Sequence, residues 1–256
     1  GPPLAANMYD VSGISFDSVN NALYICEASA KIRLVNFTSN TISTLAGMAQ
    51  QGFTGDNVIA NTTLLNTRGT ALYDPLNDQV LIPDTSNNRI RAVKLKTRII
   101  STFAGTGSIK SAGDSSSVLA PIGLSSSRFG NGLTSFFFNN ATSTLYFVDE
   151  KSFQVRAIHT RTGTISLVAG TGLTAFQGDK GTAIYTSLSS PFGLAMDVAK
   201  NVLYISDKNW HMVQSINLQT GIISRVAGTY ATSGYSGDGS SALQCLLNQP
   251  SGLDFD

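Results

Sequence analysis

Acidic and amide side chains recur along the chain, each directly after a short apolar run. The five members of this series are Asp17, Asp74, Asn139, Asp197 and Asp256. Carboxylate and amide oxygens are the ligands that Ca²⁺ prefers, so their convergence at one point would allow calcium chemistry. Each side chain can instead accept hydrogen bonds from the backbone amides of the turn that follows it. Recurrence in every copy favours turn capping, because a folding device repeats whereas a catalytic site is usually asymmetric.

Two further acidic series have the same spacing. One follows a second apolar run, and its members are Glu27, Asp84, Asp149 and Asp207. The other lies in glycine-rich segments, and its members are Asp56, Asp114, Asp179 and Asp238. We expect turn capping from the first of these, whereas a Gly-Asp loop can also present its carboxylate to Ca²⁺. Three arginines recur a few residues later, with Gln214 in the fourth copy: Arg33, Arg91 and Arg156. They should either pair with the preceding acid or cover apolar surface with their stems.

Other chemistry finds little support in the sequence. The two histidines, His159 and His211, occupy nearly equivalent places in two copies, and nothing groups either with a nucleophile and an acid. There is no Gly-x-Ser-x-Gly pattern, no phosphate-binding loop and no Cys/His spacing typical of zinc. The net charge is +1, which argues against nucleic acid as a partner. We therefore predict no catalytic residue, no metal ligand and no cofactor.

These residues are positioned by an internal repeat. Ile42-Ser-Thr-Leu-Ala-Gly47 recurs three times, and the final glycines, Gly47, Gly105, Gly170 and Gly228, are 58, 65 and 58 residues apart. The extra stretch 123–132 accounts for the longer step. Each copy holds four short runs rich in β-branched and aromatic residues, separated by Asn, Asp, Gly and Ser. In the inner run 136–138, alternation places Phe136 and Phe138 on one face and Phe137 on the other.

Four antiparallel strands per repeat predict an all-β propeller. We expect one array over residues 1–256, with repeats at about 13–69, 70–134, 135–192 and 193–251. Residues 252–256 should start a fifth copy as its first strand. Three explanations of that strand stay open: a piece of a longer propeller, an array that continues into more domains, or pairing with a neighbouring subunit. Gly1-Pro2-Pro3 is interpreted as a processed or excised end.

The chain resembles the NHL-repeat family. The resemblance rests on the loop Gly234-Tyr-Ser-Gly-Asp-Gly239 followed by Ala242, Pro250 and Gly252-Leu253, and on four phrases that recur in one order over the whole chain. Glu27 in place of Asp, and Pro83 within a strand, depart from the pattern. The resemblance implies a propeller, often of six blades, that acts as a binding or scaffolding module. Similar propellers include calcium-dependent hydrolases and RNA-binding modules.

Several features concern the protein's setting. Asn36, Asn61 and Asn140 begin Asn-x-Thr sequons at expected turns, and only 13% of residues are charged, so we expect N-linked glycans and an extracellular or cell-surface location. Cys26 and Cys245 can form an intrachain disulfide, an interchain one, or stay free thiols. Trp210 falls in a turn, where an exposed ring would contact sugar or protein. No apolar run approaches the roughly 20 residues that a membrane span needs.

The preferred hypothesis is a non-enzymatic extracellular structural or adhesive propeller, with head-to-tail assembly into a filament or larger surface protein. Its partners would be protein: copies of itself or neighbouring domains of the same chain. Two alternatives stay open, a calcium-dependent hydrolase or lyase and an intracellular protein- or RNA-binding module.

Overall fold

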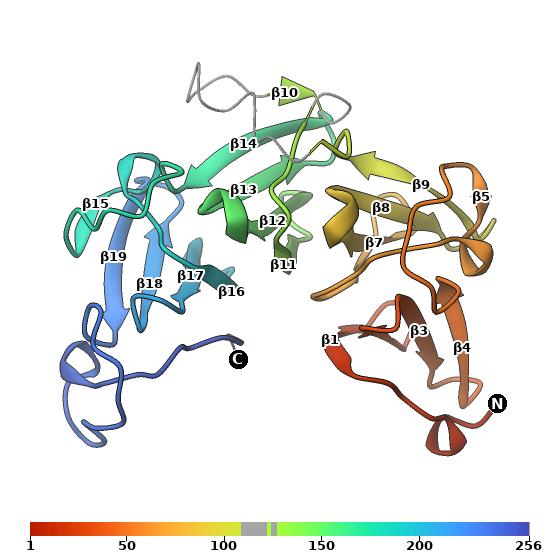
Figure 1. The fold of residues 1–256 in the computed structure, drawn as a ribbon, viewed down its shortest axis with the longest axis horizontal. Coiled ribbons are helices and arrows are strands. Elements are labelled where there is room, and N and C mark those ends of the chain that lie inside the picture. The colour runs from red at the N-terminus through yellow and green to blue at the C-terminus, as the bar shows by residue number, and fades with distance from the viewer. Residues whose placement is uncertain (109–121, 124–126, 256) are drawn as a thin grey trace.

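A computed structural model describes residues 1–108, 122–123 and 127–255 of the chain. Four antiparallel sheets follow one another along the sequence and are arranged around a common centre, with the first long strand of each sheet nearest that centre (Figure 1). This arrangement is the predicted β-propeller, and each sheet is one blade. No helix among the described residues has the length and apolar character that crossing a membrane would require.

The four blades repeat one order of strands. Blade 1 contains β1 (Val11–Asp17), β2 (Ala22–Glu27), β3 (Lys31–Asn36) and β4 (Thr41–Ala46). Blade 2 contains β5 (Val58–Ile59), β6 (Leu72–Asp74), β7 (Gln79–Asp84), β8 (Arg89–Lys94) and β9 (Ile99–Ala104). Blade 3 contains β10 (Ile122–Gly123), β11 (Leu133–Asn139), β12 (Thr144–Asp149), β13 (Gln154–His159) and β14 (Thr164–Ala169). Blade 4 contains β15 (Lys180–Thr182), β16 (Pro191–Asp197), β17 (Val202–Asp207), β18 (Met212–Asn217) and β19 (Ile222–Ala227).

A short fifth strand at the outer edge of three blades goes beyond the sequence prediction. Strands β5, β10 and β15 come from the connections and pair with β9, β14 and β19. In blade 1 the backbone of Gly1 pairs with Ile42 on β4, with the Ile42 amide donating to the Gly1 carbonyl at 2.8 Å. The outermost long strand therefore has its free edge partly covered in every blade.

The hydrophobic core lies between neighbouring blades. Phe136 and Phe138 pack with side chains of blade 2, whereas Phe137 packs with those of blade 4. The alternation predicted for this run is confirmed, and it lets one strand serve two interfaces. Blades 2 and 3 thus each bury one apolar face against the blade before and the other against the blade after.

The predicted strand at residues 252–256 differs from the structure. Residues 252–255 belong to no strand, and Asp256 lies outside the described residues. The segment instead lies along blade 4. The Ser206 hydroxyl donates to the Ser251 carbonyl at 2.8 Å, and the Phe255 ring stacks on Tyr204 with 5.7 Å between centroids.

Candidate functional site

The acids at the ends of the inner strands cap their own turns. Asp17 accepts hydrogen bonds from the amides of Val19 and Asn20 at 3.0 and 3.1 Å. Asp74, Asn139 and Asp197 accept amides two or three residues ahead in the same way. The capping role is confirmed for these four residues. Within the described ranges, no group of three His, Cys, Asp or Glu side chains is placed to hold a metal ion.

The second acidic series has a wider role than turn capping. Asp84 accepts the backbone amide of Asn66 at 2.7 Å, Asp149 that of Gly130 at 3.0 Å, and Asp207 that of Ser189 at 2.7 Å. These donors lie 17 to 19 residues earlier, in the connection that enters the blade. The carboxylates therefore fasten each incoming connection to its sheet. Sequence reasoning missed this link, because it joins residues far apart in the chain.

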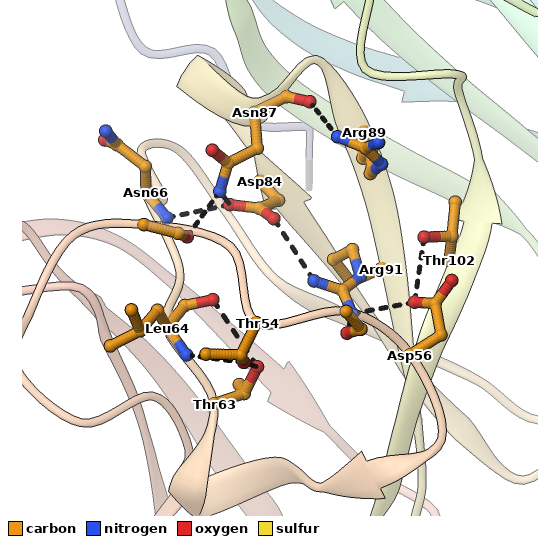
Figure 2. Close-up of polar contacts among 12 residues, drawn as sticks. Thr54, Asp56, Thr63, Leu64, Asn66, Asp84, Asn87, Arg89, Arg91 and Thr102 are labelled. Atoms are coloured by element: carbon orange, nitrogen blue, oxygen red, sulfur yellow. Dashed lines mark hydrogen bonds and ion pairs between the residues drawn. The ribbon is translucent and has the colours of Figure 1, made fainter.

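The third-strand arginines complete the fastening. Arg91 is fully buried and donates to Asp84 at 3.4 Å and to Asp56 at 2.9 Å, so it bridges the sheet and the glycine-rich loop (Figure 2). Thr102 on β9 donates to the same Asp56 carboxylate at 2.9 Å. The predicted pairing recurs as Arg33 with Glu27 at 3.2 Å and as Arg156 with Asp149 at 3.5 Å. We call each such acid–arginine pair a brace.

Burial sets the electrostatics of the braces. It raises the pKa of Asp149 to about 6, against the opposing effect of the Arg156 guanidinium. Burial likewise raises the pKa values of Asp84 and Asp207, whose hydrogen bonds to backbone amides act in the opposite direction. These carboxylates are thus held in a costly environment that their partners only partly offset.

Blade 4 rearranges its brace. Gln214 replaces the arginine, and both polar atoms of its buried amide lack a hydrogen-bond partner among the described residues. Arg225, on β19 at the position of Thr102, instead pairs with Asp179 at 2.8 Å. The Gly-Asp carboxylates of Asp56 and Asp179 therefore bind guanidinium groups, and Asp238 accepts a hydrogen bond from Tyr235 at 3.0 Å. Asp114 lies outside the described residues.

A central cavity of about 950 Å³ lies where the inner strands begin. Its lining comes mainly from those strand starts and the connections that enter them, from the turns after the second strands of all four blades, and from residues 251–253. We call it the central mouth. Its charged lining residues are Asp10, Arg68, Glu150, Lys151 and Lys208. The acids that cap the inner strands lie at the other end of these strands and do not line it.

The mouth differs from blade to blade. Directly after the repeated acid of the second series come Ala28, Thr85, Glu150 and Lys208. Glu150 accepts hydrogen bonds from Lys151 and from the Ser190 hydroxyl, each at 3.3 Å. The Lys208 ammonium lies 3.0 Å from the centre of the Phe192 ring, and burial lowers the pKa of this lysine. The mouth is therefore asymmetric. The signal in the sequence was a residue that differs between repeats directly after an acid that recurs in all of them, and the sequence analysis did not use it.

The two cysteines are separate free thiols in the structure, so the intrachain disulfide considered from sequence is not formed. An interchain disulfide stays a prediction. Cys26 is buried between blades 1 and 2, where its sulfur accepts the Ala71 amide at 3.2 Å. Cys245 lies in the connection after β19, and its thiol donates to the Ala242 carbonyl at 3.0 Å. Burial raises the pKa of Cys26 to about 12, which keeps this thiol protonated.

Trp210 is not the exposed contact residue that its turn position suggested. Its side chain is 4% exposed and packs edge-on against Phe176 and Tyr230. The ring fills a space between the turn and the neighbouring loops, which removes it from the surface. The two histidines stay apart: His159 contacts Thr144 and Ser166, and His211 accepts the Gln249 amide at 3.1 Å.

All three sequon asparagines reach the surface. Asn61 and Asn140 are exposed, and Asn36 is half-buried. The Asn36 carbonyl oxygen accepts the Ser39 amide at 2.8 Å. Attachment of glycans stays a prediction.

No family model matches the chain. It is 24% identical over 253 residues to "Protein SUPPRESSOR OF QUENCHING 1, chloroplastic" of Arabidopsis thaliana, covering 94% of this chain and 22% of that protein. It is 24% identical over 263 residues to "NHL repeat-containing protein 2" of Bos taurus, covering 92% and 35%. A gluconolactonase structure, XC5397 from Xanthomonas campestris, superposes with a TM-score of 0.60 at 12% identity, covering 98% and 68%.

The likeness to solved structures shows the fold, a β-propeller. The recurrent phrases and the relatives named NHL repeat-containing protein 2 both support the resemblance of this propeller to NHL-repeat proteins. It spans about a fifth to a third of the length of these two curated relatives, so it matches only part of each.

Proposed function

We propose that this chain is a non-enzymatic structural or adhesive module of an extracellular or cell-surface protein. Its end blade would bind another propeller blade, supplied by a second copy or by a neighbouring part of the same protein. One observation carries the proposal. Ile14 and Phe16 on β1 are 60% and 61% exposed, whereas Phe136 on β11 and Leu194 on β16 are 6% and 5% exposed.

These positions are equivalent in strand register. Ile14 lies opposite Ile25 as Phe136 lies opposite Phe147 and Leu194 opposite Ile205. In blades 3 and 4 this side of the inner strand packs against the preceding blade. Blade 1 thus presents a face of the type that other blades bury, and the partner that fits it is the apolar face of a β-sheet.

Other observations support the non-enzymatic and extracellular parts of the proposal. Among the described acids that could have formed a calcium site, Asp17, Asp74 and Asp197 cap turns. Asp56 and Asp179 pair with arginines. The sequon asparagines lie where glycans could be attached without unfolding the chain. The low charged fraction also fits a surface on which glycans supply polarity.

Sedimentation velocity with negative-stain microscopy tests self-association. The wild type should form oligomers or filaments at micromolar concentration, and Phe16→Asp should reduce the protein to monomers. Leu76→Asn is the matched control, because Leu76 is also exposed but lies in a turn of blade 2. A wild type that stays monomeric throughout would contradict assembly from copies of this chain.

The extracellular setting has its own test. The chain is secreted from eukaryotic cells, and its intact mass is measured before and after enzymatic deglycosylation. A decrease in mass on deglycosylation supports the proposal if it is absent from the triple variant Asn36→Gln, Asn61→Gln, Asn140→Gln. Secreted protein without glycan at any of the three asparagines contradicts it.

A further inference from the structure

We infer that the central mouth binds a small ligand bearing a single carboxylate, held by Arg68 and Lys208. The cavity volume of about 950 Å³ is in the range of small-molecule sites. Residues from four blades line it, so a ligand there would contact several blades at once. This inference concerns a different surface from the end blade and holds whether or not the chain self-associates.

Two cations of the mouth lack an anionic partner. Within the part of the chain that the structure describes, neither the Arg68 guanidinium nor the Lys208 ammonium forms an ion pair. Lys208 is half-buried, and its ammonium faces the Phe192 ring rather than a carboxylate. Arg68 is exposed, and Glu150 acts on Lys208 only through space, so both cations are available to bind an anion.

The remaining charges limit the ligand. Lys151 and Glu150 largely satisfy each other at 3.3 Å, and Asp10 adds a negative charge on the blade 1 side. Three cations and two anions leave the lining with a net charge of +1. A monoanion therefore suits the site, whereas a phosphate dianion would add repulsion from Asp10 and Glu150. A carboxylate also matches the two-pronged geometry of the arginine.

Most of the rest of the lining is small or polar, and Phe192 and Leu253 are its larger apolar members. Thr70, Thr134 and Ser135 line the wall, together with Gly69 and Gly193. Gly69 has a φ of +95°, and a side chain there would overlap the Thr134 carbonyl, so the wall is tightly packed backbone. Such a surface favours a ligand with a hydroxylated or amide-bearing body. Acidic sugars and acidic amino acid derivatives share this chemistry.

Calorimetric titration at low ionic strength tests the inference with two matched pairs of probes. One pair is N-acetyl-glutamate N-methylamide and its glutamine analogue, and the other is galacturonate and galactose. At least one acid should bind with a Kd of about 1 mM or tighter, and its neutral partner should bind about tenfold more weakly. The pair that shows the difference identifies the source of the carboxylate.

Variants assign the binding to the two cations. Lys208→Met and Arg68→Gln should each weaken binding of the acid about tenfold. Lys208→Arg should retain most of the affinity, and Lys96→Met, on an exposed lysine outside the cavity, should leave it unchanged. Thermal unfolding of each variant verifies that it is folded. Binding by neither acid, equal binding of acid and neutral probe, or wild-type affinity in both Lys208→Met and Arg68→Gln would overturn the inference.

Discussion

The braces and the central mouth lie next to each other in sequence but follow opposite rules. The acid that follows the second strand is Glu or Asp in every blade, and in blades 2 to 4 it binds backbone amides of the incoming connection. The very next residue lines the mouth and is different in each blade: Ala28, Thr85, Glu150 and Lys208. Of two adjacent positions, folding therefore restricts the residue type at the first much more than at the second.

The difference has a physical cause. A brace acid is buried and must accept hydrogen bonds from several donors, so few other side chains can replace it at that position. The mouth position is less constrained: Thr85 donates to the Arg68 and Leu133 carbonyls, whereas no hydrogen bond joins the Glu150 or Lys208 side chain to the backbone of the described residues. Position in a repeat thus separates scaffold from candidate site: what recurs supports the blade, and what varies is available for binding.

The largest effect should come from breaking a brace. Arg91→Met removes the cation that joins Asp84 to the Asp56 loop and leaves a buried carboxylate without it. We expect a loss of about 3 to 5 kcal/mol in the free energy of unfolding, measured by urea denaturation. Lys94→Met on the same strand is the control, because Lys94 is exposed. A loss below about 1 kcal/mol would show that the brace is replaceable.

The pH dependence of stability should reveal the brace of blade 3. The pKa of Asp149 is about 6 in the folded protein, whereas its ordinary value is 3.8, so the folded state binds more protons between these two pH values. Stability from this group is therefore full below about pH 4 and is lost as pH rises through about 6, by on the order of 3 kcal/mol.

Asp149→Asn should abolish this part of the slope. Denaturation at intervals from pH 4 to pH 7 measures the difference between wild type and variant, which isolates Asp149 from Asp84 and Asp207. The variant should be less stable than the wild type at pH 4, where the wild-type carboxyl group is protonated and accepts the Gly130 amide. The difference in stability should narrow toward pH 7, because only the wild type loses stability as this carboxyl group ionises. A constant gap would mean that Asp149 is ionised throughout.

The scaffold was far more predictable from sequence than the site. Recurrent phrases predict strands, caps and the Arg–acid pairs because each depends on local spacing, as at Asp17 with Val19 or Arg33 with Glu27. Three features depend on distant contacts and were missed or mistaken: the amide of Asn66 on Asp84, the burial of Trp210, and the mouth itself. A repeat shows what the blades share, whereas the mouth arises from what they do not share.

A smaller effect should come from exchanging the two brace designs. Blade 2 has Arg91 with Thr102, whereas blade 4 has Gln214 with Arg225 at the same places. Arg225→Thr should cost about 1 kcal/mol, since its pair with Asp179 is partly exposed. Adding Gln214→Arg should recover that loss, because an arginine there can bridge Asp207 and Asp179 as Arg91 bridges its two acids. Urea denaturation of the single and double variants measures the coupling, and additive losses would contradict equivalence of the designs.

The smallest effect on stability should come from the mouth. Lys208 has no ion pair among the described residues, and its lowered pKa shows that the folded protein disfavours its charge. Lys208→Met keeps a stem of similar length against Phe192 and removes that charge, so stability at pH 7 should change by less than about 0.5 kcal/mol. Urea denaturation beside Arg91→Met measures both in one experiment. A loss at Lys208 comparable to that at Arg91 would make the mouth part of the scaffold, and the contrast between invariant and variable positions would no longer separate folding from binding.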